Sequence, residues 1–310
     1  MSAIPLDSAV NRFADFFDSS IVKRYFEHFP RTRSAVMSED WDTLLILDAC
    51  RYDAFEDLNT IPGNLESRLS SGSNTGEFFE KNFAGTTHHD TVYVTANPVP
   101  RVEKWCDVDI DSVFHHVVDV WEDHWDPSVN TVRPEPMAES VRQAHLEFPN
   151  KRIIGHFIQP HQPFIGETGR TIDEKGMLAY DELTDREASV GKKVWDQLED
   201  GELPSDTVKQ AYLENLEIVL PHVEAVVEAI SGKTVVTADH GNLFGEYVRP
   251  FPIRRYGHPR GYHTENLIKV PWLEPPFRTR RTITTDPPLA STSETDRGSR
   301  LDRLAHLGYR

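Results

Sequence analysis

The sequence has little cysteine, no long apolar run and too few basic residues to balance its acidic ones. Its 310 residues include two cysteines in unrelated contexts, so a disulfide framework is excluded. No apolar run reaches the roughly 20 residues that a membrane-spanning helix needs. The first ten residues also lack the basic and apolar regions of a secretory signal. We therefore expect a cytoplasmic protein without membrane insertion.

The charge balance is strongly acidic. Asp and Glu number 50 against 33 Lys and Arg, which makes the formal net charge −17. A chain of this charge lacks the basic footprint that contacts phosphates, which argues against nucleic acid as a partner. A halophilic, haloarchaeal cytoplasm would explain the acidic and lysine-poor composition, and an acidic mesophilic enzyme is the alternative. Composition does not separate the two, and it leaves the oligomeric state open.

Two short apolar runs each end in an aspartate. One runs into Asp48, and the other runs into Asp239, which His240 and a glycine follow directly. A buried carboxylate is costly unless a partner neutralises it. At the carboxyl ends of parallel strands, such side chains would face the crevice where open α/β sheets bind ligands. The pattern therefore predicts a divalent metal site with Asp48, Asp239 and His240 as ligands. A helix cap followed by a surface histidine is the simpler alternative for the Asp239-His240 motif alone.

Four segments, whose order along the chain also matches, resemble the alkaline-phosphatase superfamily, its sulfatase branch in particular. Leu44 to Phe55 is similar to the first strand and turn, and Val235 to Glu246 to the late Asp-His-Gly-x(3)-Gly-Glu motif. Residues 152–164 end in Pro-His-Gln-Pro-Phe, like the central sulfatase strand. Tyr256 to His263 precedes a Val-Pro strand, like the segment with the last catalytic histidine. The ordered set covers roughly residues 40 to 275.

The resemblance implies a doubly wound α/β fold with a mostly parallel sheet and helices on both faces. It also implies a metal-dependent hydrolase of a sulfate or phosphate ester, acting on a small molecule or a glycan. His161 and His258 would stabilise charge or protonate the leaving group. His263 is the alternative to His258, because the spacing alone does not rank them. Arg51 would clamp a non-bridging oxygen, or else form a surface salt bridge.

The superfamily also requires a nucleophile at the start of a helix. The loop before an expected helix at 77–83 is rich in Ser and Thr, and Ser73 or Thr75 would cap that helix. Free backbone N–H groups and the helix dipole favour an oxyanion there. Within the resemblance Thr75 is the expected nucleophile, with its oxygen on the metal, and Ser73 is the second candidate. A plain helix cap is the alternative.

The chain departs from the sulfatase pattern in several places. The Cys/Ser-x-Pro-x-Arg signature, whose first residue becomes formylglycine, is absent, which puts sulfate specificity in doubt. Ala49 follows Asp48, and Gln159 stands where two-metal relatives often have an acid. We therefore expect one divalent ion, Zn, Mn, Mg or Ca, with two left open. A phosphoryl or phospho-alcohol transferase is the alternative function, and a metal-binding protein without turnover is the third.

Apolar periodicity also predicts the organisation of the chain. The expected parts are a helical lead-in at 1–40, the catalytic domain at 41–275, a flexible linker at 276–298 and a short docking helix at 299–310. The expected strands are 43–48, 91–96, 152–158, 234–238 and 267–273, of which the second would deliver Asn97 to the site. The expected helices are 77–83, 137–147, 173–198 with breaks, and 206–231. The tryptophan-rich segment 105–136 is expected as an insertion beside the substrate mouth.

Overall fold

A seven-stranded sheet forms the centre of the computed structural model, which describes residues 19–28, 35–172, 176–184 and 192–289. The strands lie in the order β2-β11-β8-β1-β7-β3-β4. They are β1 (Thr43–Leu47), β2 (Asn64–Leu69), β3 (His88–Thr95), β4 (Phe114–Asp119), β7 (Arg152–Phe157), β8 (Thr234–Thr237) and β11 (Lys269–Glu274). β1 pairs in parallel with β7 and β8, and β3 in parallel with β7 and β4. β11 runs antiparallel to β8 and β2, so the sheet is mostly parallel.

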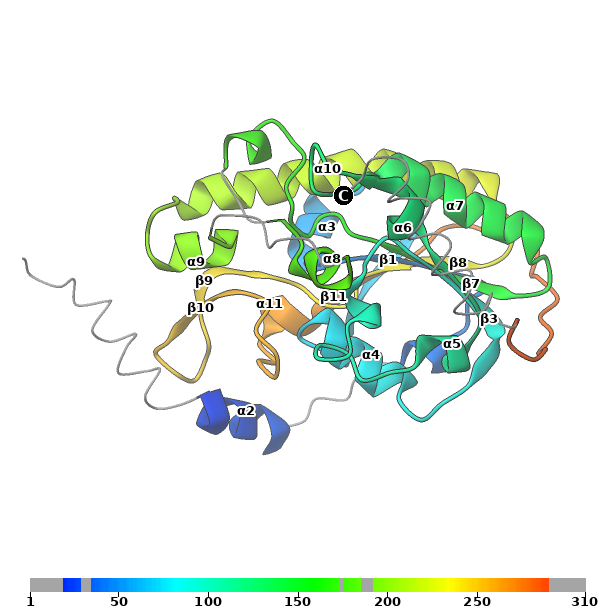
Figure 1. Cartoon of the computed structure of the whole chain (residues 1–310), viewed down its shortest axis with the longest axis horizontal. Coiled ribbons are helices and arrows are strands. Elements are labelled where there is room, and N and C mark those ends of the chain that lie inside the picture. Colours follow the sequence, from blue (N-terminus) through cyan, green and yellow to red (C-terminus); the bar gives the residue numbers. More distant parts are fainter. Residues whose placement is uncertain (1–18, 29–34, 173–175, 185–191, 290–310) are drawn as a thin grey trace, which may run out of the picture.

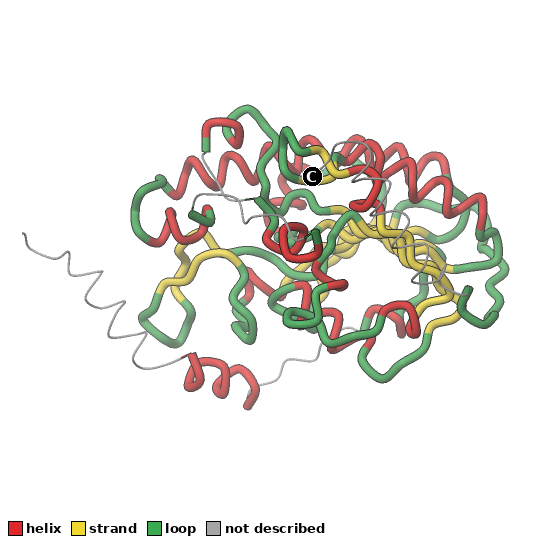
Figure 2. The backbone as a smooth tube through the Cα atoms, in the orientation of Figure 1, coloured by secondary structure: helices red, strands yellow, loops and turns green. Residues whose placement is uncertain are grey.

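Helices cover both faces of the sheet (Figures 1 and 2). One face carries α3 (Tyr52–Leu58), α7 (Pro134–Glu147) and α10 (Ser205–Ala229), and the other carries α4 (Thr75–Phe83) and α5 (Ile110–Val113). Alternate residues of β1 explain this arrangement, since successive strand side chains point to opposite faces. Leu45 and Leu47 pack in the cluster of α7 and α10, whereas Leu44 and Ile46 pack with the phenylalanines of α4. The predicted doubly wound α/β fold is confirmed.

Smaller elements surround this core. They are α2 (Ser19–His28), η1 (Val36–Ser38), η2 (Val99–Arg101), α6 (Val120–His124), β5 (Trp125–Asp126), β6 (Thr131–Val132), η3 (Gly169–Thr171), α8 (Leu178–Leu183), α9 (Val194–Glu199), β9 (Leu243–Tyr247), β10 (Arg254–Gly257) and α11 (Glu265–Ile268). β9 and β10 pair antiparallel, and α2 packs near them through Val22 and Phe26. Among the described residues, no helix has both the length and the apolar character needed to cross a bilayer.

The expected strands are present with ends shifted by at most three residues, but two strands of the sheet, β2 and β4, were not expected. β4 lies within the segment 105–136, which therefore completes one edge of the sheet as well as reaching the site. Residues 276–289, part of the expected linker, are bound to the body. Arg280 pairs with Asp42, and the Thr284 N–H donates to the Asn150 carbonyl. The docking helix expected at 299–310 and most of the lead-in lie outside the described residues.

Candidate metal centre and active site

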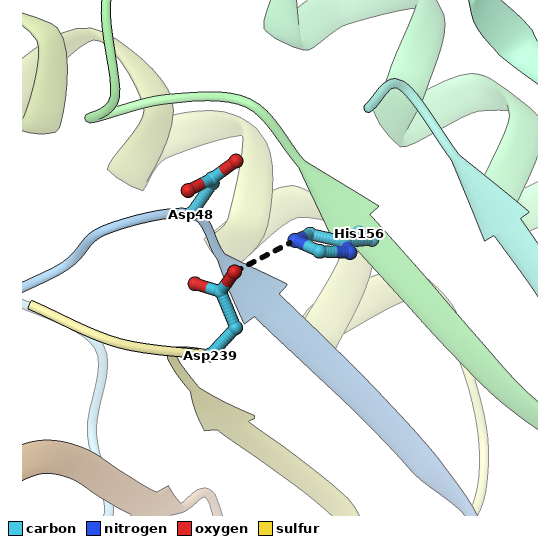
Figure 3. Close-up of side chains that lie close together, drawn as sticks. All are labelled: Asp48, His156 and Asp239. Carbon is cyan, nitrogen blue, oxygen red and sulfur yellow. Dashed lines mark ion pairs between the residues drawn. The ribbon is translucent and has the colours of Figure 1, made fainter. Parts of the chain in front are cut away.

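Polar side chains meet where the central parallel strands end (Figure 3). Asp48 follows β1 directly, Asp239 comes two residues after β8, and His156 is the penultimate residue of β7. Each of these buried side chains offers one ligand atom, and the three atoms all lie within 4.8 Å of one another. Because neighbouring parallel strands end at the same edge of the sheet, residues nearly 200 positions apart converge there. This is a candidate metal centre.

The carboxylate of Asp239 is held by backbone on one side and faces the cluster on the other. Its Oδ1 accepts hydrogen bonds from the N–H groups of Ala49 (3.1 Å) and His240 (2.9 Å). Its Oδ2 accepts one from the Thr75 hydroxyl (2.9 Å) and lies 3.8 Å from Nε2 of His156. Ala49 has φ 59°, a left-handed conformation that turns its N–H toward the carboxylate. The second oxygen therefore points at the nucleophile candidate and the cluster.

Asp48 has one oxygen bound and one without a hydrogen bond. Its Oδ2 accepts a hydrogen bond from Asn97 (2.5 Å), the residue that the sequence placed at this edge. Its Oδ1 is buried and has no hydrogen-bond partner in the described part of the chain. Burial raises the pKa of Asp48, and the negative charge of Asp239 raises it further. A bound cation would remove both penalties.

His156 was not predicted as a site residue. Its Nδ1 lies 2.9 Å from the Tyr93 hydroxyl, and Phe79 stacks on its ring. Burial lowers its pKa to about 4, so the imidazole is neutral at pH 7. With the proton on Nδ1 and donated to Tyr93, the lone pair of Nε2 faces the carboxylates, and this atom has no hydrogen bond among the described residues. The available signal was a histidine inside an otherwise apolar strand.

His240 lies close to both of the predicted aspartate ligands. Its Nδ1 is 2.7 Å from the carbonyl oxygen of Gly241, to which a protonated Nδ1 donates. Its Nε2 lies 3.4 Å from Asp48 Oδ1, 3.4 Å from Asp239 Oδ2 and 3.4 Å from Thr75 Oγ1. Held in this tautomer, the imidazole presents a lone pair to two carboxylates and a hydroxyl.

The donor set fits a divalent cation. Two carboxylates and the imidazole of His156 offer ligand atoms within 4.8 Å of one another, and Nε2 of His240 lies 3.4 Å from both carboxylates. Two of the ligand atoms, Asp48 Oδ1 and His156 Nε2, are buried without hydrogen bonds in the described residues. Buried polar atoms normally have partners, so such orphans need an explanation. Oxygen and imidazole nitrogen ligands suit Zn²⁺ and related divalent metals.

Thr75 begins the helix α4 and faces this centre. Asn74, not Thr75 or Ser73 as expected, caps the helix: its side chain accepts a hydrogen bond from the Glu77 N–H (2.8 Å). The threonine hydroxyl is thereby left to bind Asp239. Gly76 follows, and a Cβ there would lie 2.1 Å from the carbonyl oxygen of Trp105, so glycine lets the helix start pack closely.

Ser73 and His263 lie behind the helix rather than in the metal centre. The Ser73 hydroxyl donates to Glu77 (2.8 Å) and accepts from the Gly261 N–H (2.8 Å), while His263 Nε2 lies 2.8 Å from the other Glu77 oxygen. Burial raises the pKa of Glu77, but its hydrogen bonds and the charge of His263 outweigh this and lower it to about 2. The ionised Glu77 therefore ties α4 to the loop that carries His258. We call Ser73, Glu77 and His263 the brace.

His161 and His258 lie beside the centre. The centroid of the His258 ring is 4.9 Å from that of His161 and 4.8 Å from that of His240. Both histidines line a cavity of about 400 Å³ together with Asp48 and Thr75. Burial lowers the pKa of His161 to about 4 and that of His258 well below its ordinary value. Neutral rings are poor proton donors at pH 7 and have a single N–H, which in His161 is Nδ1–H donating to the Gln162 carbonyl.

Arg51 is bound in ion pairs. Its guanidinium pairs with Asp53 (2.6 Å) and Glu246 (2.5 Å) and donates to the carbonyl oxygen of Asn242. Among the described residues, those that line the cavity do not include Arg51. The structure thus gives it the salt-bridge arrangement and connects β9 to the turn after Asp48.

No protein-family model and no curated protein matches the chain. Among solved structures, the integral membrane lipooligosaccharide phosphoethanolamine transferase A of Neisseria meningitidis is 11% identical, with TM-score 0.42, over 74% of this chain and 47% of its own. A candidate sulfatase of Bacteroides thetaiotaomicron is 12% identical, with TM-score 0.42, over 79% and 66%. An alkaline phosphatase superfamily protein of Vibrio parahaemolyticus is 10% identical, with TM-score 0.41, over 79% and 61%. The chain thus spans about half to two thirds of these neighbours, and we base the proposed function on the site itself.

Proposed function

We propose that this protein is a metal-dependent enzyme that cleaves a sulfate or phosphate ester through a covalent intermediate on Thr75. The observation that carries the proposal is the hydrogen bond from the Thr75 hydroxyl to Asp239, at a helix start and beside two buried ligand atoms without hydrogen bonds. A hydroxyl held against buried carboxylates at a helix start has the surroundings of an activated nucleophile. The predicted metal ligands Asp48, Asp239 and His240 would hold the cation, with His156 added to the set.

Each residue of the site has a separate role in the proposed reaction. When bound, the divalent ion would supply charge stabilisation for the reacting group and its attacking oxygen. Thr75 Oγ1 forms the bond to phosphorus or sulfur as its proton passes toward Asp239 Oδ2, and the bond to the alcohol oxygen breaks, so that the alcohol leaves as its anion and takes a proton from solvent. His258, with its proton on Nε2, would donate a hydrogen bond to an equatorial oxygen, where negative charge accumulates, whereas His161 donates from Nδ1 to the Gln162 carbonyl and presents the lone pair of Nε2. An acceptor then attacks the threonyl ester and frees Thr75.

The acceptor decides between two reactions with the same first half. Water as the acceptor makes the protein a hydrolase, and an alcohol makes it a phosphoryl or phospho-alcohol transferase. Both use the same nucleophile and metal centre, so we keep both as forms of one proposal.

A substrate panel tests the proposal. The metal-loaded protein is assayed against aryl sulfate, aryl phosphate, a phosphodiester and an aryl phosphonate ester, each with and without a sugar alcohol as acceptor. Release of the aryl alcohol with rate saturation supports the proposal, and an acceptor-dependent product identifies a transferase. Absence of turnover on every ester with Zn²⁺, Mn²⁺, Mg²⁺ and Ca²⁺, in protein that binds the ion, would favour the metal-binding alternative.

A further inference from the structure

The cavity above Thr75 has a charge opposite to that of the protein as a whole. Among the described residues that line it, three are cationic, Lys104, Lys193 and Arg260, and one, Asp48, is acidic. The complete chain carries 50 acidic residues against 33 Lys and Arg. A cluster of one sign in a hollow concentrates the field and attracts ligands of opposite charge.

Within the described part of the chain, two of these cations have acidic partners and the third has none. Lys104 pairs with Glu182 (2.5 Å), and Arg260 pairs with Glu80. Lys193 makes no hydrogen bond or ion pair through its side chain with any residue that the structure describes. A cation without a partner keeps its full capacity to bind an anion.

Lys193 lines the cavity from the start of α9, an element that carries none of the candidate metal ligands. It is the N-cap residue of that helix, and the next two residues include Trp195, which also lines the cavity. The ring of Trp195 contacts that of His258 edge-on, with centroids 6.4 Å apart. Lys193 also acts on the same histidine through its charge. Burial lowers the pKa of His258 most, followed by the charges of His240, His161 and Lys193.

The lining of the cavity can also accommodate an organic group. Trp105 and Trp195 line the cavity together with the apolar residues Met177 and Leu178. Apolar and aromatic side chains with a few placed polar groups are typical of small-molecule sites. The cavity therefore offers an apolar wall and a free cation in addition to the reacting centre.

We propose that the cavity binds an ester whose alcohol part carries a second anionic group, and that Lys193 recognises this second anion. The inference rests on the proposed function, in which the anion of the ester itself is bound at the metal centre, beside His161 and His258. Lys193 comes from the start of α9, whereas the candidate metal ligands come from the ends of β1, β7 and β8, and its side chain makes no hydrogen bond or ion pair with another described residue. A doubly anionic substrate, such as a sugar or aryl ester with a carboxylate or another ester anion, matches both positions.

Binding of unreactive ligands tests the inference without requiring turnover. Calorimetry would compare phenylphosphonate with 4-carboxyphenylphosphonate, which differ by one carboxylate, on the metal-loaded protein. We expect the carboxylate to tighten binding by roughly 10-fold in the wild type, as a charged hydrogen bond does. Lys193→Ala should remove most of this difference.

The neighbouring lysine provides a matched control. Lys192 is exposed, lies outside the cavity lining and pairs with Asp200 and Glu202, so Lys192→Ala should keep the full preference. Equal binding of the two phosphonates to the wild type, or an unchanged preference in Lys193→Ala, would overturn the inference. Neither result bears on the ester-cleaving activity, which the substrate panel tests separately.

Discussion

The hydroxyl of Thr75 lies 2.9 Å from Oδ2 of Asp239, although 164 positions separate the two residues in the chain. This contact joins the start of a helix on one face of the sheet to the end of a central strand. The two residues have different functions, which mutation can distinguish. Asp239 belongs to the ligand set and accepts the Thr75 proton, whereas Thr75 supplies the attacking oxygen.

The first prediction concerns the metal ligands from the strand ends. Asp239→Asn removes a ligand charge, so we expect the bound divalent ion to fall from about one per chain to nearly none. Elemental analysis of dialysed protein measures this. Asp57→Asn, at an exposed position of α3, is the control and should retain the ion. Equal metal content in Asp239→Asn and the wild type would remove Asp239 from the ligand set.

The second prediction concerns His156, which pattern reasoning did not find. His156→Ala removes an imidazole whose Nε2 faces the two carboxylates, and we expect the affinity for Zn²⁺ to fall by at least 10-fold. Titration with a chromophoric chelator measures the affinity. Tyr93→Phe should weaken binding less, because it removes only the hydroxyl beside Nδ1. An unchanged affinity in His156→Ala would show that the centre forms from the other ligands alone.

The third prediction concerns the brace. Glu77→Gln loses the charge that binds Ser73 and His263, so α4 and the His258 loop should hold their relative positions less well. We expect kcat to fall by about 10-fold, with KM and metal content nearly unchanged. Ser73→Ala should show a smaller effect of the same kind. Loss of all turnover in Ser73→Ala, with activity retained in Thr75→Ala, would instead make Ser73 the nucleophile.

The fourth prediction concerns the C-terminal segment and pH. The pKa of His145 in the folded protein is about 4, below the ordinary 6.5, because burial and the charge of Arg281 disfavour its protonated form. In the unfolded chain His145 takes up its proton at higher pH. The free energy of unfolding should therefore decline as pH falls from about 6.5 toward about 4, and this contribution should level off below that.

A variant that does not titrate at this position tests the effect. His145→Gln should show a smaller decline in the free energy of unfolding over that range, measured by denaturant titration at several pH values. His124→Gln, at an exposed position, should keep the wild-type slope. An identical slope in His145→Gln would mean that His145 does not contribute to the acid sensitivity.

The sequence predicted the central fold because the core strands have short, uniformly apolar runs that end in polar residues. Asp48 and Asp239 were visible for the same reason, since a carboxylate that closes a buried run needs a partner. β2 was not visible, because most of its side chains are exposed or half-buried and its sequence, NLESRL, has little apolar character. Such an edge strand forms through pairing with β11, which sequence periodicity does not reveal.

Side-chain direction limited the prediction of the site. Ser73 and Thr75 are two positions apart in the same polar loop, on either side of the capping residue Asn74. Ser73 binds Glu77 in the brace, whereas Thr75 binds Asp239 at the metal centre. His258 and His263 likewise share one loop, yet one lines the cavity and the other binds Glu77. These outcomes depend on contacts between segments about 180 positions apart in the chain, which local patterns do not encode.

Trapping the covalent intermediate tests the central claim most directly. The metal-loaded protein is quenched in acid during turnover of an aryl phosphate or aryl sulfate and digested, and the peptide that contains Thr75 is sequenced by mass spectrometry. We expect the phosphoryl or sulfuryl group on Thr75 in the wild type, and no adduct in Thr75→Ala, whose turnover should fall on the order of 10³-fold or more while its metal content stays unchanged. An adduct on another residue, or undiminished turnover in Thr75→Ala, would contradict the account.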